Sequence, residues 1–134
     1  MPRFHFIPFV LALPLALAGC ADAGSHRPLA QTAWQIAAID GAAAASPDAR
    51  LQFRKKRLAA SAGCNTMVGK WRIAAGRLMS EGLAQTEVWC DDARIMAQER
   101  ALSALLTGNP RFQMKDARLM LQAAGHSAEL LPAR

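Results

Sequence analysis

A single helical pattern lies between two groups of short alternating segments, and this order restricts the folds open to the chain. In the alternating segments, apolar residues take every second position, as in strands that bury one face. These segments cover residues 34–38, 51–54, 58–61, 70–73, 77–79, 112–114, 119–121 and 128–131. Strands and helices do not alternate along the chain, which disfavours a parallel sheet. We therefore expect an α+β, mostly β domain with antiparallel strands and one α-helix.

The helical segment covers residues 93–107, and its two ends carry the usual signals. Asp91 and Asp92 precede it, and either can cap the first turn, where a carboxylate also interacts favourably with the helix dipole. The segment is rich in Ala, Leu, Met, Gln, Glu and Arg, which are good helix formers. Gly108 and Pro110 follow and end the helix. Capping explains the two aspartates better than a metal site does.

Glu99 falls within the apolar stripe that Ile95, Leu102 and Leu106 form on this helix. A carboxylate at this place has two interpretations. In the first, it lies at the edge of the stripe and pairs with a nearby arginine. In the second, it is a buried functional acid. We favour the first, because buried acids need a specific partner.

Cysteine usage indicates one disulfide in the folded part of the chain. Cys64 and Cys90 remain when Cys20, discussed below, is set aside. An even pair in an exported protein favours a disulfide, which would close a loop of about 26 residues and stabilise the fold by roughly 3 to 4 kcal/mol. A pair of free buried thiols and a metal pair are the alternatives. No histidine lies near either cysteine, which disfavours a metal.

The N-terminal residues have the pattern of an export signal. Arg3 is followed by an apolar run that Leu17-Ala18-Gly19-Cys20 closes. The run is shorter than the roughly 20 apolar residues of a membrane-spanning helix. The four closing residues resemble the lipobox of bacterial lipoproteins. This resemblance implies that residues 1–19 are removed and that Cys20 is acylated and becomes the new N-terminus.

The same signal suggests where the protein works. Under enteric-type sorting, Ala21 in place of aspartate after the acylated cysteine favours the outer membrane over the inner membrane, with the domain facing the periplasm. Asp22 leaves inner-membrane retention open. Residues 20–31 are small and polar and are expected to form a tether, and residues 32–132 are expected to form the domain. We expect a monomer.

A motif around the two cysteines has a physical logic of its own. Gly63 permits a turn that a side chain would block, and Asn65 can hydrogen-bond nearby backbone and hold that turn. A bridge from Cys64 to Cys90 would then pin the start of the helix to the sheet. This structural role is favoured over a redox role, because redox pairs usually have Cys-x-x-Cys spacing.

Together these residues resemble the META domain, the family of the heat-inducible bacterial lipoprotein HslJ. The matching residues are Trp34, Gly63, Cys64, Asn65, Gly69, Thr86 and Cys90, with the helix and a C-terminal hairpin after them. The resemblance implies antiparallel strands that curve into an open barrel around one helix. It also implies a loose association with envelope stress, although the family has no established biochemical activity.

The sequence lacks the usual signatures of catalysis. The chain contains three histidines, and only His126 falls within the expected domain, in a predicted turn. Residues 63–69 lack the Lys-Ser/Thr of a phosphate loop, and no metal-ligand spacing occurs. We therefore expect no cofactor, no metal and no enzymatic activity, but binding of an envelope protein or an apolar ligand. The alternative is a thiol-redox factor or enzyme that uses Cys64 and Cys90 or Glu99.

Charge gives one further candidate site. Without residues 1–19 the chain has 15 Lys and Arg against 10 Asp and Glu, because only Arg3 is lost. The densest basic run is Arg54, Lys55, Lys56 and Arg57. A solvated turn is the simplest interpretation, and contact with anionic membrane phosphates is the functional one. The exported location and the scarcity of aromatic residues argue against nucleic acid.

Overall fold

The computed structural model describes residues 29–134. The expected signal peptide, the acylation site Cys20 and most of the expected tether lie outside the described residues. Among the residues described, no helix is long and apolar enough to cross a membrane.

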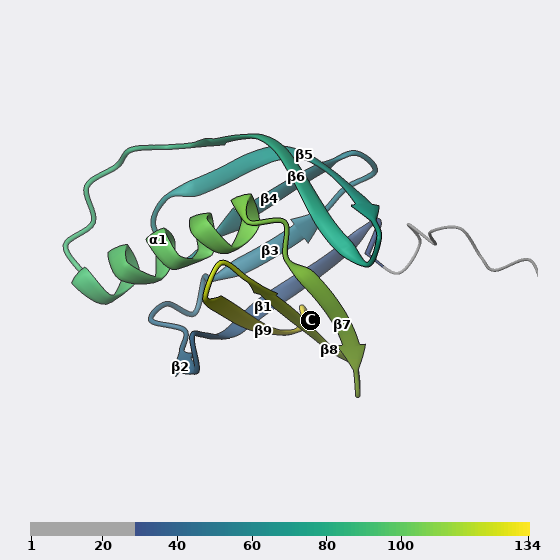
Figure 1. Cartoon of the computed structure of the whole chain (residues 1–134). Coiled ribbons are helices and arrows are strands. Elements are labelled where there is room, and N and C mark those ends of the chain that lie inside the picture. Colours follow the sequence, from purple (N-terminus) through teal and green to yellow (C-terminus); the bar gives the residue numbers. More distant parts are fainter. Residues whose placement is uncertain (1–28) are drawn as a thin grey trace, which may run out of the picture.

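The described chain consists of nine strands and one helix (Figure 1). In chain order these are β1 (Thr32–Ile39), β2 (Ala42–Ala43), β3 (Arg50–Phe53), β4 (Arg57–Ser61), β5 (Thr66–Ala74), β6 (Arg77–Gln85), α1 (Ala93–Thr107), β7 (Arg111–Lys115), β8 (Arg118–Ala123) and β9 (His126–Pro132). Each predicted strand is found, and the helix has the predicted limits. Strands β5 and β6 are longer than predicted, and the short β2 lies in an alanine-rich run for which no strand is predicted.

Eight of the strands form a closed antiparallel barrel. They pair in the order β1, β3, β4, β5, β6, β7, β8 and β9, and β9 pairs in turn with β1. The remaining strand, β2, pairs with β1 at the edge of this ring. The predicted fold class, antiparallel strands curved into a barrel with one helix, is thus confirmed.

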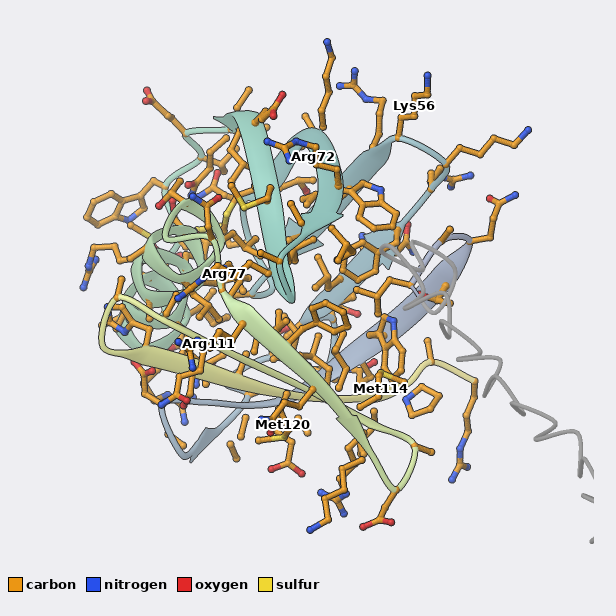
Figure 2. All side chains as sticks on the ribbon, turned by 45° about the vertical axis from the view of Figure 1, so that its right-hand side comes forward. Lys56, Arg72, Arg77, Arg111, Met114 and Met120 are labelled. Atoms are coloured by element: carbon orange, nitrogen blue, oxygen red, sulfur yellow. A yellow bond between two sulfur atoms is a disulfide. The ribbon has the colours of Figure 1, made fainter. Side chains whose placement is uncertain are left out.

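The barrel is weakest where β6 meets β7. These strands share a single residue pair, Arg77 with Arg111, which lie side by side in Figure 2. The helix compensates for this weak junction, because it follows β6 in the chain and packs against β6, β8 and β9 (Figure 1). Its inner face buries Leu102, Leu105 and Leu106.

Alternation places the core inside the barrel. The largest fully buried side chains are Phe53, Leu29, Ile36, Ile39, Leu51, Leu58, Met67, Leu78, Leu102, Leu105, Leu106 and Leu119. Burying one side chain of this size contributes about 1.5 to 3 kcal/mol. Leu29 lies in the range expected to be tether, but both the backbone N–H and the hydroxyl of Thr32 donate to its carbonyl oxygen and fold it onto the core.

One end of α1 is capped as predicted. Asp92 is the N-cap, and its side chain accepts a hydrogen bond from the backbone N–H of Arg94 at 2.8 Å. The Arg94 guanidinium also donates to this carboxylate, and these hydrogen bonds lower the pKa of Asp92 to about 2. Of the two candidate aspartates, the second therefore begins the helix.

A polar contact joins the two strands that close the barrel. His126, expected in a solvated turn, begins β9, and its Nδ1 lies 2.8 Å from Oδ2 of Asp40, just after β1. The other Asp40 oxygen accepts from the backbone N–H of Ser127 at 2.8 Å. The hydrogen bond from Ser127, followed by that with His126, holds the pKa of Asp40 below its ordinary value of 3.8.

We expect Asp40→Asn to lower the free energy of unfolding at pH 7 by about 0.5 to 1 kcal/mol. A lowered pKa means that the carboxylate stabilises the fold fully above pH 3.8 and that this contribution is lost as the pH falls further. The gap between wild type and variant, measured by urea denaturation, should therefore shrink below that pH. Asp48→Asn removes the same charge from an exposed turn and is the control. An equal loss in both variants would contradict the role of this contact.

Candidate functional site

The loop between β4 and β5 depends on a glycine. Gly63 has a φ of +123°, a conformation that residues with a side chain rarely adopt. A Cβ atom at this position would lie 2.2 Å from Cβ of Ser46. The close approach lets the loop turn toward α1, and it brings Cys64 and Asn65 to the start of the helix.

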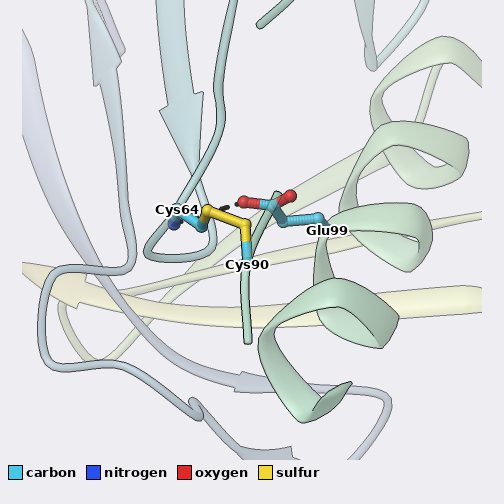
Figure 3. A group of neighbouring side chains, drawn as sticks. All are labelled: Cys64, Cys90 and Glu99. Atoms are coloured by element: carbon cyan, nitrogen blue, oxygen red, sulfur yellow. Dashed lines mark hydrogen bonds between the residues drawn. A yellow bond between two sulfur atoms is a disulfide. The ribbon is translucent and has the colours of Figure 1, made fainter. Parts of the chain in front are cut away.

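The structure joins Cys64 to Cys90 by a disulfide, and their Cα atoms are 6.3 Å apart. Cys64 lies in the β4–β5 loop, and Cys90 lies in the segment between β6 and α1 (Figure 3). The bridge thus ties the sheet to the approach of the helix, which is the arrangement that the sequence predicts.

Asn65 connects the same two segments by hydrogen bonds. Its side chain is buried, and its Oδ1 accepts from the backbone N–H of Val88 at 2.7 Å and from the hydroxyl of Thr86 at 2.9 Å. Its Nδ2 donates to the carbonyl oxygen of Val88 at 3.0 Å. Sequence analysis expects Asn65 to hold its own turn. The structure shows instead that it holds the segment before the helix.

Glu99 completes this network from the helix (Figure 3). Only 2% of the residue is exposed. One carboxylate oxygen accepts from the backbone N–H groups of Cys64, at 3.2 Å, and of Asn65, and the other accepts from Nδ2 of Asn65 at 2.9 Å. The prediction that Glu99 pairs with an arginine is wrong. Within residues 29–134, the hydrogen bonds to the Glu99 carboxylate come from this loop alone. These three donors explain how the carboxylate can be buried.

The same residues offer little to a metal ion while the disulfide is intact. Ligand atoms of Cys64, Cys90 and Glu99 all lie within 4.8 Å of one another. Thiolates bind metals, but the two sulfur atoms here are bonded to each other. One carboxylate, already occupied by three donors, remains. The oxidised site therefore does not fit a metal.

An open hollow of about 400 Å³ lies beside this network. Residues 85–89 line it together with Asn65, Met96, Glu99 and Arg100. The most exposed apolar side chains among the described residues are at its rim, where Trp89 is 82% exposed and Val88 is 60% exposed. The Trp89 indole N–H donates to Asp91 at 3.2 Å. This site could not be predicted from the sequence, because neither periodicity nor spacing shows that Trp89 faces solvent.

Two residues of the family motif lie outside this network. Trp34 belongs to the core, and its indole N–H donates to the hydroxyl of Thr32 at 2.8 Å. Gly69 lies where the β5–β6 pairing shifts register, and a Cβ atom there would be 2.9 Å from the carbonyl oxygen of Glu81. Both residues therefore serve the barrel rather than the hollow.

Methionines contribute one residue to the lining of the hollows described. Met114 and Met120 are exposed, and they lie on the lower strands in Figure 2. Met114 pairs with Leu119, so Met114 and Met120 face opposite sides of the β7–β8 hairpin. Met96 is the methionine that lines the hollow beside Asn65.

The basic run is divided by the structure. Lys55 and Lys56 line a second open hollow, of about 480 Å³, with Ala30, Lys70, Trp71, Arg72 and Glu81. Arg57 lines a neighbouring hollow, and the carbonyl oxygen of Arg54 accepts the indole N–H of Trp71 at 2.8 Å. Sequence analysis missed Lys70 and Arg72, although their alternation with Trp71 already places them on the outer face of a strand.

We expect Glu99→Gln to lower the free energy of unfolding by about 2 kcal/mol. Both carboxylate oxygens of Glu99 accept hydrogen bonds, so the NH₂ group of a glutamine would face a donor instead of an acceptor. Asn65 cannot adapt by turning its amide, since Val88 and Thr86 fix its oxygen. Urea denaturation measures the loss. Glu87→Gln, on the exposed rim of the same hollow, should change stability little. Equal stability of Glu99→Gln and wild type would contradict the network.

Comparison with known proteins agrees with this fold. No curated protein sequence matches the chain significantly. One solved NMR structure has 18% sequence identity and a TM-score of 0.67, and the match covers 75% of this chain and 88% of that chain. An NMR structure of a protein from Burkholderia xenovorans has 20% identity and a TM-score of 0.63 over 99% of both chains. At these identities the likeness concerns the fold alone. The family model of the META domain matches residues 27–134, and the chain therefore belongs to the META domain family.

Proposed function

We propose that this protein is a membrane-anchored, non-enzymatic lipoprotein of the bacterial envelope that binds an envelope protein or an apolar ligand through residues 86–90. The lipobox-like residues that end at Cys20 support the anchor. Membership of the META domain family supports an HslJ-like role in envelope stress or envelope maintenance. Trp89, fixed in place and facing solvent, supports binding.

The presentation of Trp89 is the observation that carries this proposal. On one side of it, both backbone polar groups of Val88 bond to the buried side chain of Asn65. On the other side, Cys90 is held by its disulfide to Cys64. A large aromatic side chain held out by a fixed backbone loses little conformational entropy when a partner covers it. Aromatic side chains that a partner buries in this way dominate the binding energy of many interfaces.

The hollow next to Trp89 suits the rim of such an interface. Arg100 and Glu87 line it beside Val88 and Met96, so it combines charged and apolar groups. Interfaces commonly have this composition, with an apolar core and a polar rim. Single exposed apolar residues are ordinary on protein surfaces, but two adjacent ones on a braced segment beside a hollow indicate a binding site.

A cross-linking experiment tests this site. A photo-reactive phenylalanine analogue at position 89 should form an adduct with its partner in intact cells, and the same analogue at Gln113, exposed on β7, should not. Trp89→Ala should leave the free energy of unfolding within about 0.5 kcal/mol of wild type, because the side chain is largely exposed. Equal adduct formation at both positions would contradict the proposal.

The alternative function is a thiol-redox factor, and the disulfide beside a buried carboxylate is the observation that favours it. A structural bridge fits better than a redox pair, because Cys64 is half-buried, Cys90 is buried and a long loop separates them.

Intact mass spectrometry of the membrane-extracted protein tests both the anchor and the bridge. We expect the mass of residues 20–134 plus acyl groups, with Cys64 and Cys90 unreactive toward alkylation until strong reductant is added. Their reduction should lower stability by roughly 3 kcal/mol, because the bridge closes a 26-residue separation. An unprocessed chain would contradict the anchor. A bridge reduced under mild conditions in a domain of unchanged stability would support the redox alternative.

A further inference from the structure

The hollow of about 480 Å³ beside Trp71 has an unbalanced charge. Lys55, Lys56, Lys70 and Arg72 line it, and Glu81 is the one acidic residue among its lining residues. We propose that this cleft, the cationic cleft, binds the phosphate headgroup of an anionic phospholipid in the membrane that carries the anchor. The proposal rests on the proposed function for the identity of that membrane.

Two segments bring the cations to one place. Lys55 and Lys56 lie in the turn between β3 and β4, and Lys70 and Arg72 lie on β5. The backbone N–H of Trp71 donates to the carbonyl oxygen of Lys56 at 3.2 Å and holds the turn against β5. In Figure 2, Lys56 and Arg72 lie at the same end of the barrel, and Arg111 lies away from them.

The cationic cleft also has apolar lining residues, and the position of one of them, Trp71, is fixed. Trp71 is 7% exposed, and its indole N–H donates to the carbonyl oxygen of Arg54 at 2.8 Å. Its ring contacts that of Phe53 edge-on, with the ring centroids 4.9 Å apart. Ala30 lines the cleft beside it. Cationic and apolar lining residues together match an anionic phospholipid, whose phosphate is joined to a less polar diacylglycerol.

The positive charge is not neutralised within the domain. Across residues 29–134, Lys55, Lys56 and Lys70 form no ion pair, and Arg72 pairs with Glu81 at 3.2 Å on the exposed surface. Exposed pairs of this kind hold their partners weakly. At least three cations therefore remain available to an anion.

Chain length selects a membrane as the source of that anion. Ala30, at the edge of the cationic cleft, is ten residues after the expected anchor at Cys20. Ten residues span at most about 36 Å. A tether of this length allows the cleft to reach the lipid surface, where cations on a protein attract anionic headgroups within roughly one Debye length, about 8 to 10 Å.

Vesicle binding of the non-acylated chain 21–134 tests the proposal. This chain keeps every strand pairing and core contact that the structure describes, because these lie within residues 29–134. Wild type should sediment with vesicles of phosphatidylcholine containing about 30% phosphatidylglycerol, and not with phosphatidylcholine alone. Lys56→Gln/Lys70→Gln should reduce the bound-to-free ratio on the order of tenfold, because each cation at an anionic surface contributes to binding.

A matched variant separates the cationic cleft from the overall charge. Arg111→Gln/Lys115→Gln removes the same two charges from β7, outside the cleft, and should bind nearly as well as wild type. Thermal melts should show that both variants remain folded. Equal weakening of the two variants, or no binding of wild type to anionic vesicles, would overturn the proposal.

A second measurement locates the ligand. Titration with soluble dihexanoyl phosphatidylglycerol should shift the indole N–H resonance of Trp71 and leave that of Trp34 in place, because Trp34 lies outside the cleft. Shifts of equal size at both indoles, or at neither, would overturn the site. Neither test depends on acylation, so a failed anchor at Cys20 appears only in the mass of the extracted protein and is distinguished from a failed cleft.

Discussion

The buried pair of Asn65 and Glu99 is the interaction on which the described site depends. Through it, the β4–β5 loop, the segment before α1 and the helix itself share one set of hydrogen bonds. A buried carboxylate is costly unless donors surround it, and this one has three. The disulfide adds a covalent link between two of the same segments. Removing Glu99 would leave several buried donors unsatisfied at once, so the network is cooperative.

The network also explains how a barrel with one weak junction stays closed. The single residue pair between β6 and β7 gives little hydrogen bonding, and α1 covers that side. Glu99, midway along the helix, holds it to the β4–β5 loop, and the bridge holds the segment that leads into the helix. Leu102, Leu105 and Leu106 pack the C-terminal half of the helix. Polar contacts thus fix the position of α1, and apolar burial supplies most of the free energy.

Much of the fold could be predicted from the sequence, because strand alternation and helix signals are local. The helix limits at 93–107 follow from Asp92, directly before the helix, and Gly108, directly after it. The partner of Glu99 could not be predicted, because it lies 34 positions away, and a carboxylate in an apolar stripe is equally compatible with an arginine. Similarly, the cationic cleft combines Lys56 and Lys70 from separate segments, which only the β4–β5 pairing brings together.

The two candidate surfaces lie at opposite ends of one strand. Strand β4 begins at Arg57, next to the cationic cleft, and its last residue, Ser61, leads into the loop that holds Val88 and Trp89. The five residues of β4 span about 17 Å, so the two surfaces are separated along this strand. A domain that rests on lipid by its cationic cleft therefore holds Trp89 apart from the lipid surface. Under the proposed anchoring, this arrangement leaves the aromatic side chain open to a partner, and the cationic cleft and Trp89 have complementary roles.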